Sequence, residues 1–103
     1  MKAPFTTSGA AFVLASRALV MSAVEPYVVV GVFEDGEFVP FHRTRDPDLL
    51  QQTARIILSE RRAAIRGGVV RRRVLMEEYE RLRELFGEFG IPMDTDEEGR
   101  VRV

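Results

Sequence analysis

The sequence predicts a single α+β domain over residues 1–103, with an N-terminal helix, a β-hairpin and then two long helices that form a helical hairpin. Three observations point to this fold class. An apolar stripe at helical spacing runs through residues 70–89, an Asp-Gly pair joins two β-rich segments, and an Asp-Pro-Asp sequence precedes another helical pattern. With 103 residues, of which 46% are apolar and 30% charged, the chain is long enough to bury a core of its own.

The N-terminal part of the chain is expected to contain an extended lead-in over residues 1–9 and a helix over residues 10–24. Arg17 is the only charged residue in that helix, so the helix is apolar around most of its circumference and should be buried. Lys2 before an apolar run resembles the start of a secretory signal peptide, but Arg17 interrupts the run and polar residues occupy its beginning. Uncharged stretches are also far shorter than the roughly 20 residues of a membrane span. We therefore expect a cytoplasmic protein that has no membrane contact.

A β-hairpin is the expected structure of the next segment. The β-rich runs 27–33 and 37–43 flank Asp35-Gly36, and a type I′ turn needs positive φ at both of its central residues. Pro40 has no N–H to donate, so the second strand should be a sheet edge or should carry Pro40 on its unpaired side. A two-residue turn sets the following opposite pairs: Glu34–Glu37, Phe33–Phe38, Val32–Val39 and Val30–Phe41.

Two helices should follow the hairpin. Asp46-Pro47-Asp48 combines a capping residue, a proline at the first helical position and an acid in the first turn, and the helix is expected from Pro47 to Arg66. Gly67-Gly68 breaks the pattern, and Gly90 ends the last helix. So short a connection favours an antiparallel pair, with one long kinked helix as the alternative.

Residues 94–103 are expected to be a flexible tail or a short edge strand. Asp94, Asp96 and Glu98 are spaced as in the first half of an EF-hand calcium loop. The chain ends before the position at which such a loop needs its bidentate Glu, so an acidic surface turn without metal is the expected structure.

The apolar stripe of the last helix is the predicted protein interface. It consists of Leu75, Tyr79, Leu82, Phe86 and Phe89. A stripe of this kind more often forms the core of its own domain, but three helices and a hairpin here all carry large apolar groups, and surplus apolar surface usually marks association. The expected partner is a second copy of the chain in a two-fold dimer, with another protein as the alternative. The opposite face of this helix should be solvated and charged: Glu77, Glu78, Glu80, Arg81, Arg83, Glu84 and Glu88.

A cluster of arginines provides an alternative function, the binding of nucleic acid. Its members are Arg55, Arg61, Arg62, Arg66, Arg71, Arg72 and Arg73. They should lie near the tip of the helical pair, where guanidinium groups would meet phosphate. Two other interpretations stay open: a solvated helix face, or ion pairs with the acid-rich segment from Glu77 to Glu98. The net charge of −1 provides no global attraction for a polyanion, and the sequence has no DNA-binding or RNA-binding motif.

Catalysis is not expected. The chain has no cysteine and one histidine, His42, which lies on the expected edge strand and has no second histidine to share a metal. No serine occupies a G-x-S-x-G turn, and no glycine-rich phosphate loop is present. The sequence therefore predicts no catalytic residues, no metal and no cofactor, and favours a small non-enzymatic interaction or assembly module.

Overall fold

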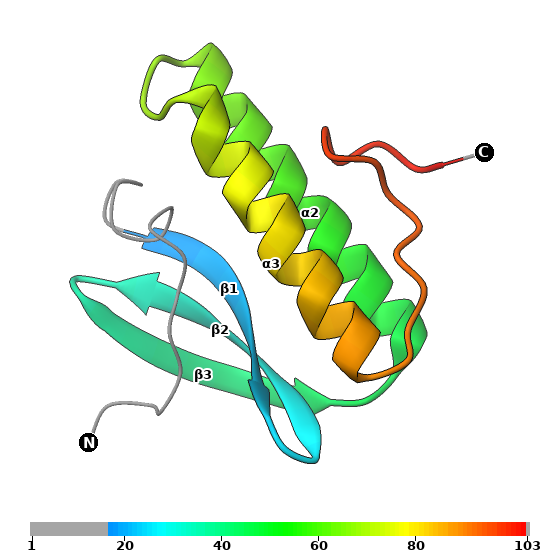
Figure 1. The fold of residues 1–103 in the computed structure, drawn as a ribbon. Coiled ribbons are helices and arrows are strands. Elements are labelled where there is room, and N and C mark those ends of the chain that lie inside the picture. Colours follow the sequence, from blue (N-terminus) through cyan, green and yellow to red (C-terminus); the bar gives the residue numbers. More distant parts are fainter. Residues whose placement is uncertain (1–16, 103) are drawn as a thin grey trace.

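The computed structural model describes residues 17–102 and shows two layers, a sheet and a pair of helices (Figure 1). The sheet has three antiparallel strands in the order β1-β2-β3, namely β1 (Arg17–Val24), β2 (Tyr27–Glu34) and β3 (Glu37–Thr44). The helices α2 (Pro47–Arg66) and α3 (Arg72–Glu88) run antiparallel to each other and cover one face of the sheet. Beyond α3 the chain turns and runs back beside α2.

The predicted fold class was wrong in its N-terminal half. Residues 17–24 form the edge strand β1 instead of the end of a helix, so a three-stranded meander precedes the helices in place of a helix and a two-stranded hairpin. Residues 10–16 of the predicted helix and the predicted lead-in over residues 1–9 lie outside the described residues. β1 pairs with β2 along its whole length, from Arg17 opposite Glu34 onward. The pairing with β1 provides hydrogen-bond partners for the backbone groups of β2 that do not face β3. The stability gained in this way exceeds the helix propensity of the Ala, Leu and Met residues in segment 17–24.

The hairpin of β2 and β3 confirms the predicted turn. Asp35 has φ 52° and Gly36 has φ 82°, the positive values that the type I′ turn requires. Three of the predicted pairs, Glu34–Glu37, Phe33–Phe38 and Val32–Val39, are confirmed. The predicted pair of Val30 with Phe41 was wrong, because a β-bulge shifts the register and places His42 opposite Val30. Pro40 lies on the edge strand, as its missing N–H predicted.

The start of α2 and its separation from α3 follow local signals. The Asp46 carboxylate caps α2 by accepting a hydrogen bond from the Asp48 N–H at 3.0 Å, and Pro47 is the first helical residue. The helix ends at Arg66, as predicted, and a turn separates it from α3, so the alternative of one kinked helix was wrong. For the segment after α3, where a flexible tail or a short edge strand was expected, the described residues 94–102 contain a single antiparallel bridge between Thr95 and Val101 and no strand of greater length.

The core lies between the sheet and the two helices. Each element contributes apolar side chains: Met21, Val28 and Val30 from the sheet, Leu50, Ala54, Ile57 and Leu58 from α2, and Leu75, Tyr79, Leu82, Leu85 and Phe86 from α3. Ile91 closes the cluster from the segment after α3. No helix within residues 17–102 combines the length and the apolar character needed to cross a bilayer.

Candidate functional site

The predicted protein interface lies in the core of the chain. Leu75, Tyr79, Leu82 and Phe86 are buried, and Phe89 is half-buried against the same cluster. These side chains pack against α2 and the sheet, which provide the apolar partners that a second copy was expected to supply. The stripe is therefore not an accessible surface of the folded chain, and any contact between copies would use other residues.

The arginine cluster is divided by the fold, and three of its members contact the acid-rich segment after α3. Arg55 donates to both carboxylate oxygens of Asp94, at 3.2 and 3.1 Å. Arg72 lies 2.6 Å from the carboxylate of Glu98, and Arg62 donates to the backbone carbonyl of Glu98 at 3.1 Å. For these three arginines, pairing with the acid-rich segment is the arrangement that the structure shows.

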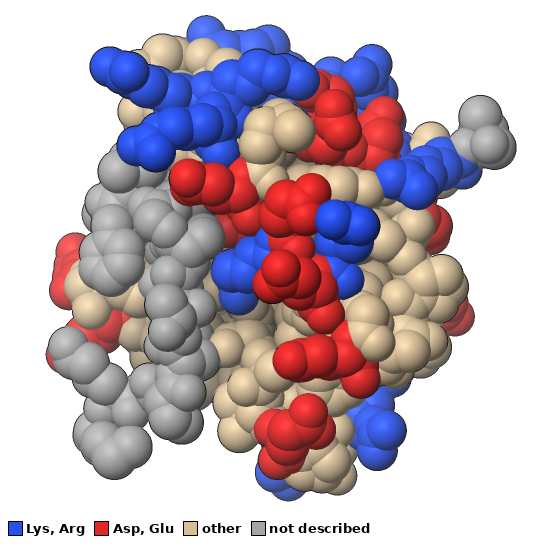
Figure 2. All heavy atoms as spheres, in the orientation of Figure 1, with Lys and Arg blue, Asp and Glu red and all other residues tan. Residues whose placement is uncertain are grey.

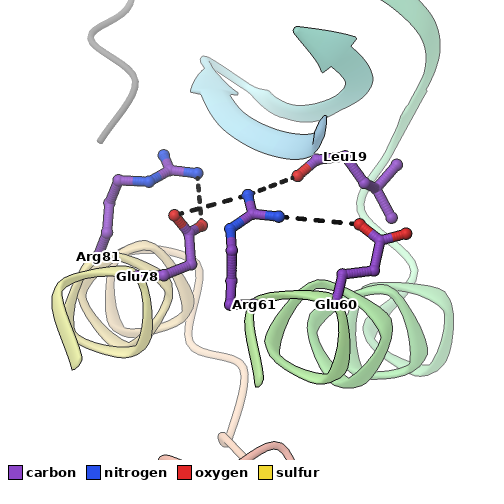
Figure 3. A network of polar contacts seen from close by, with 5 residues as sticks. All are labelled: Leu19, Glu60, Arg61, Glu78 and Arg81. Carbon is purple, nitrogen blue, oxygen red and sulfur yellow. Dashed lines mark hydrogen bonds and ion pairs between the residues drawn. The ribbon is translucent and has the colours of Figure 1, made fainter. Parts of the chain in front are cut away.

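Arg61 is enclosed between the layers (Figure 3). Its side chain is 0% exposed, and its Nη2 donates to the backbone carbonyl of Leu19 in β1 at 2.9 Å. The same nitrogen lies 3.8 Å from the carboxylate of Glu78, which is 1% exposed and also accepts a hydrogen bond from Arg81 at 3.2 Å. One buried guanidinium thus connects α2, the edge strand β1 and, through Glu78, α3.

The electrostatics of Arg61 are those of a structural charge. Burial lowers the pKa of its guanidinium, whereas the carboxylates of Glu78 and Glu60 act to raise it. Arginine nevertheless remains charged at physiological pH, so its cost of burial must be offset by partners. Nε and Nη1 of Arg61 are buried without a hydrogen-bond partner among residues 17–102. Because it has no exposed surface, Arg61 is excluded from any binding surface for nucleic acid.

Glu78 corrects another sequence-based expectation. It was expected on the solvated face of the last helix, but it lies three residues after Leu75 and four before Leu82, within the apolar stripe. Arg61 likewise follows Ile57 by four residues on the buried face of α2. Opposite charges inside the apolar stripes of two consecutive helices are therefore the signal that could have identified this buried pair.

The remaining arginines lie exposed where α2 ends and α3 begins. We call Arg66, Arg71 and Arg73 the arginine end of the molecule. Within residues 17–102 no ion pair involves Arg66 or Arg71, and Arg73 reaches Glu77 at 3.6 Å with both side chains largely exposed. Figure 2 shows basic side chains gathered at this end of the helix pair and acidic ones further along the same face.

The start of α3 places unpaired backbone N–H groups at the arginine end, where the C-terminus of α2 also lies. Its N-cap residue, Arg71, makes no side-chain capping hydrogen bond, and its first turn contains no acidic residue. The N-terminus of a helix carries a partial positive charge and backbone N–H groups that favour anions. The arrangement can therefore attract negatively charged groups, although it offers no nucleophile and no acid–base pair.

The other candidates occupy ordinary surface positions. His42 is exposed on β3, and Asp96 uses its carboxylate within its own turn, where it accepts hydrogen bonds from the N–H groups of Glu98 and Arg100. Among residues 17–102, no three acidic or histidine side chains are grouped so that they could hold a metal ion. Comparison of the chain with protein-family models, with curated proteins and with solved structures finds no match.

Proposed function

We propose that this chain is a non-enzymatic binding module that contacts the phosphate backbone of nucleic acid through the arginine end. One observation carries the proposal: Arg66, Arg71 and Arg73 are exposed together at one end of the helix pair, whereas other arginines of the cluster are engaged within the fold. The net charge of −1 does not oppose this function, because a phosphate contact depends on local charge at distances below about 10 Å.

Two properties are compatible with phosphate as the ligand. The planar guanidinium presents paired donors that match two phosphate oxygens, as they match the two oxygens of a carboxylate. The uncapped start of α3 lies beside these side chains and supplies a helix terminus of the kind that binds phosphate. The contacts carry no base-specific information, so the expected binding is independent of nucleotide sequence.

The test is a salt series on the full chain with a generic DNA duplex and a single strand of equal length. Three phosphate contacts predict that log K falls against log salt with a slope of about −2.7 on duplex. The triple variant Arg66→Glu/Arg71→Glu/Arg73→Glu should abolish this binding. A matched control, Arg17→Glu/Arg45→Glu/Arg83→Glu, makes the same charge change at exposed arginines elsewhere and should retain most of it.

Three outcomes would contradict the proposal. The first is no binding to either strand form at low salt. The second is an equal loss of affinity in the control variant, which would show that net charge and not the arginine end is responsible. The third is equally tight binding of poly-glutamate, which would indicate an acidic protein as the partner.

Self-association is the second candidate function, with a second copy of the chain as the partner. The supporting observation is on β3, where Phe41 is 62% exposed and Val39 is 45% exposed. Apolar side chains next to each other on one exposed strand favour contact between copies. Light scattering from micromolar to millimolar concentration tests it: a dimer that Phe41→Ser returns to a monomer supports this candidate, and a wild-type monomer throughout excludes it.

A further inference from the structure

We infer that Arg55, Arg62 and Arg72 are additional phosphate contacts, and that the acidic segment of residues 94–99 competes for them within the same chain. This inference rests on the proposed function, because it extends the same surface from the arginine end along α2. It identifies the acidic segment as an internal substitute for a polyanion.

The contacts place anionic groups along a row of arginines. Arg55 and Arg62 are seven residues apart on α2, two turns of one helix face, and Arg72 lies across from them at the start of α3. Asp94 and Glu98 supply the carboxylates, at 3.1 Å from Arg55 and 2.6 Å from Arg72. A phosphate backbone that reached past the arginine end would meet this row next, but would find these guanidinium groups engaged.

Contacts other than the ion pairs of Asp94 and Glu98 hold the acidic segment against α2. Thr95 is fully buried, and the backbone of Gly99 lies so close to α2 that a Cβ atom there would be 2.9 Å from Cβ of Leu58. The Gln51 side chain donates to the carbonyl of Pro92 at 2.9 Å just before the segment. Neutral variants of the two acids should therefore leave the segment where it is and remove only its charge.

The ion pairs themselves are weak enough to be exchanged. Each pair has one partner that is more than one-third exposed, Asp94 at 38% and Arg72 at 59%, whereas Arg55 at 29% and Glu98 at 17% are less exposed. Salt therefore screens these pairs in part. A backbone phosphate offers two charged oxygens, as a carboxylate does, so it can form the same bidentate contact with a guanidinium. The acidic segment should thus lower the affinity for nucleic acid without preventing binding.

The test compares the full chain with Asp94→Asn/Glu98→Gln on the same duplex and salt series. The expected result is at least about fivefold tighter binding and a salt slope that is steeper by about 1.8, because Arg55 and Arg72 add two phosphate contacts. A matched control, Glu84→Gln/Glu88→Gln, removes the same charge from exposed positions of α3 and should change affinity by less than about twofold. Circular dichroism and thermal unfolding verify that both variants fold.

The outcomes separate this inference from the proposed function. Binding by the wild type, with an Asp94→Asn/Glu98→Gln variant that behaves like the control, overturns the inference and leaves the proposed function standing. Absence of binding in all three proteins at low salt overturns both. A tighter variant whose added affinity disappears when Arg55 and Arg72 are also changed to Gln supports the inference directly.

Discussion

Arg61 and Arg71 belong to the same run of arginines, yet they occupy opposite environments. Arg61 is enclosed between β1, α2 and α3, whereas Arg71 is exposed at the N-cap of α3. The difference comes from position: Arg61 falls on the buried face of α2, whereas Arg71 follows the buried Val70 in the connection and its own side chain is exposed. A cluster of charges along a sequence is therefore not a cluster on a surface, and substitutions in the two places should act on different properties.

The largest effect is expected from Arg61→Met, which removes one partner of the buried pair. The buried Glu78 carboxylate would then have Arg81 as its remaining cationic partner. Loss of one partner of a buried ion pair lowers the free energy of unfolding by about 3 kcal/mol. Urea denaturation measures this loss. Replacing both charges, in Arg61→Met/Glu78→Leu, should be less damaging than the single variant, and a double variant that is worse would contradict the assignment of Arg61 as a charge that needs Glu78.

The next largest loss of stability is expected from a substitution at Gly99, at the end of the acidic segment that contacts α2. Gly99 has φ 85°, and its added Cβ would lie 2.9 Å from Leu58, so Gly99→Ala should cost about 2–3 kcal/mol. Gly90 has φ 68° but open space around it, and Gly90→Ala should cost only about 1 kcal/mol. Thermal unfolding of the two variants compares them, and equal losses would show that the close packing on α2 is unimportant.

A smaller effect should depend on pH. Desolvation acts to raise the pKa of the Asp96 carboxyl, but the backbone N–H groups of Arg100 and Glu98 stabilise its charged form, and the net pKa lies below the ordinary value. A lowered pKa in the folded state means that stability from this group is present above the unfolded pKa of about 3.9 and is lost as pH falls through the folded pKa. The stability difference between wild type and Asp96→Asn, measured in urea, should therefore shrink below about pH 4. A difference that grows in acid would refute the predicted direction.

The smallest effect on stability is expected at the arginine end. Arg66→Ala and Arg71→Ala should each change the unfolding free energy by less than about 0.5 kcal/mol, since both side chains are exposed and neither forms an ion pair within residues 17–102. Urea denaturation against wild type measures this. A larger loss at either position would mean that the arginine end supports the fold, in which case reduced binding in its variants would have a structural cause.

Local signals predicted the parts of the fold that are determined locally. The Asp35-Gly36 turn and the Asp46 cap depend on the chemistry of a few adjacent residues, and both are confirmed. The segment 17–24 could not be assigned in this way, because a short apolar run fits a buried helix and a buried strand equally well. Only the neighbouring strand β2, with backbone groups to satisfy on both sides, decides between them.

The candidate site was predictable only in outline. The sequence identified all the arginines and the option of pairing with the acid-rich segment, but which arginine meets which acid depends on how the chain returns along α2. The burial of Arg61 could be predicted from its four-residue spacing to Ile57. Its hydrogen bond to the Leu19 carbonyl could not, because that contact requires β1 to lie beside the helices. For the predicted interface, the apolar stripe on α3 was identified correctly from the sequence, but what covers it was not. The sheet and α2 cover that stripe within the same chain.

Each of the two borders of the sheet carries a feature that disfavours pairing with a further β-strand. In a two-residue hairpin the bonded and non-bonded pairs alternate from the turn, which places Pro40 in a non-bonded pair with its nitrogen directed outward from β3. On the opposite border, the Leu19 carbonyl of β1 is already occupied by Arg61. A foreign β-strand that approached either side would find a missing donor or an engaged acceptor, so fibrillar growth by strand addition is discouraged even at high concentration.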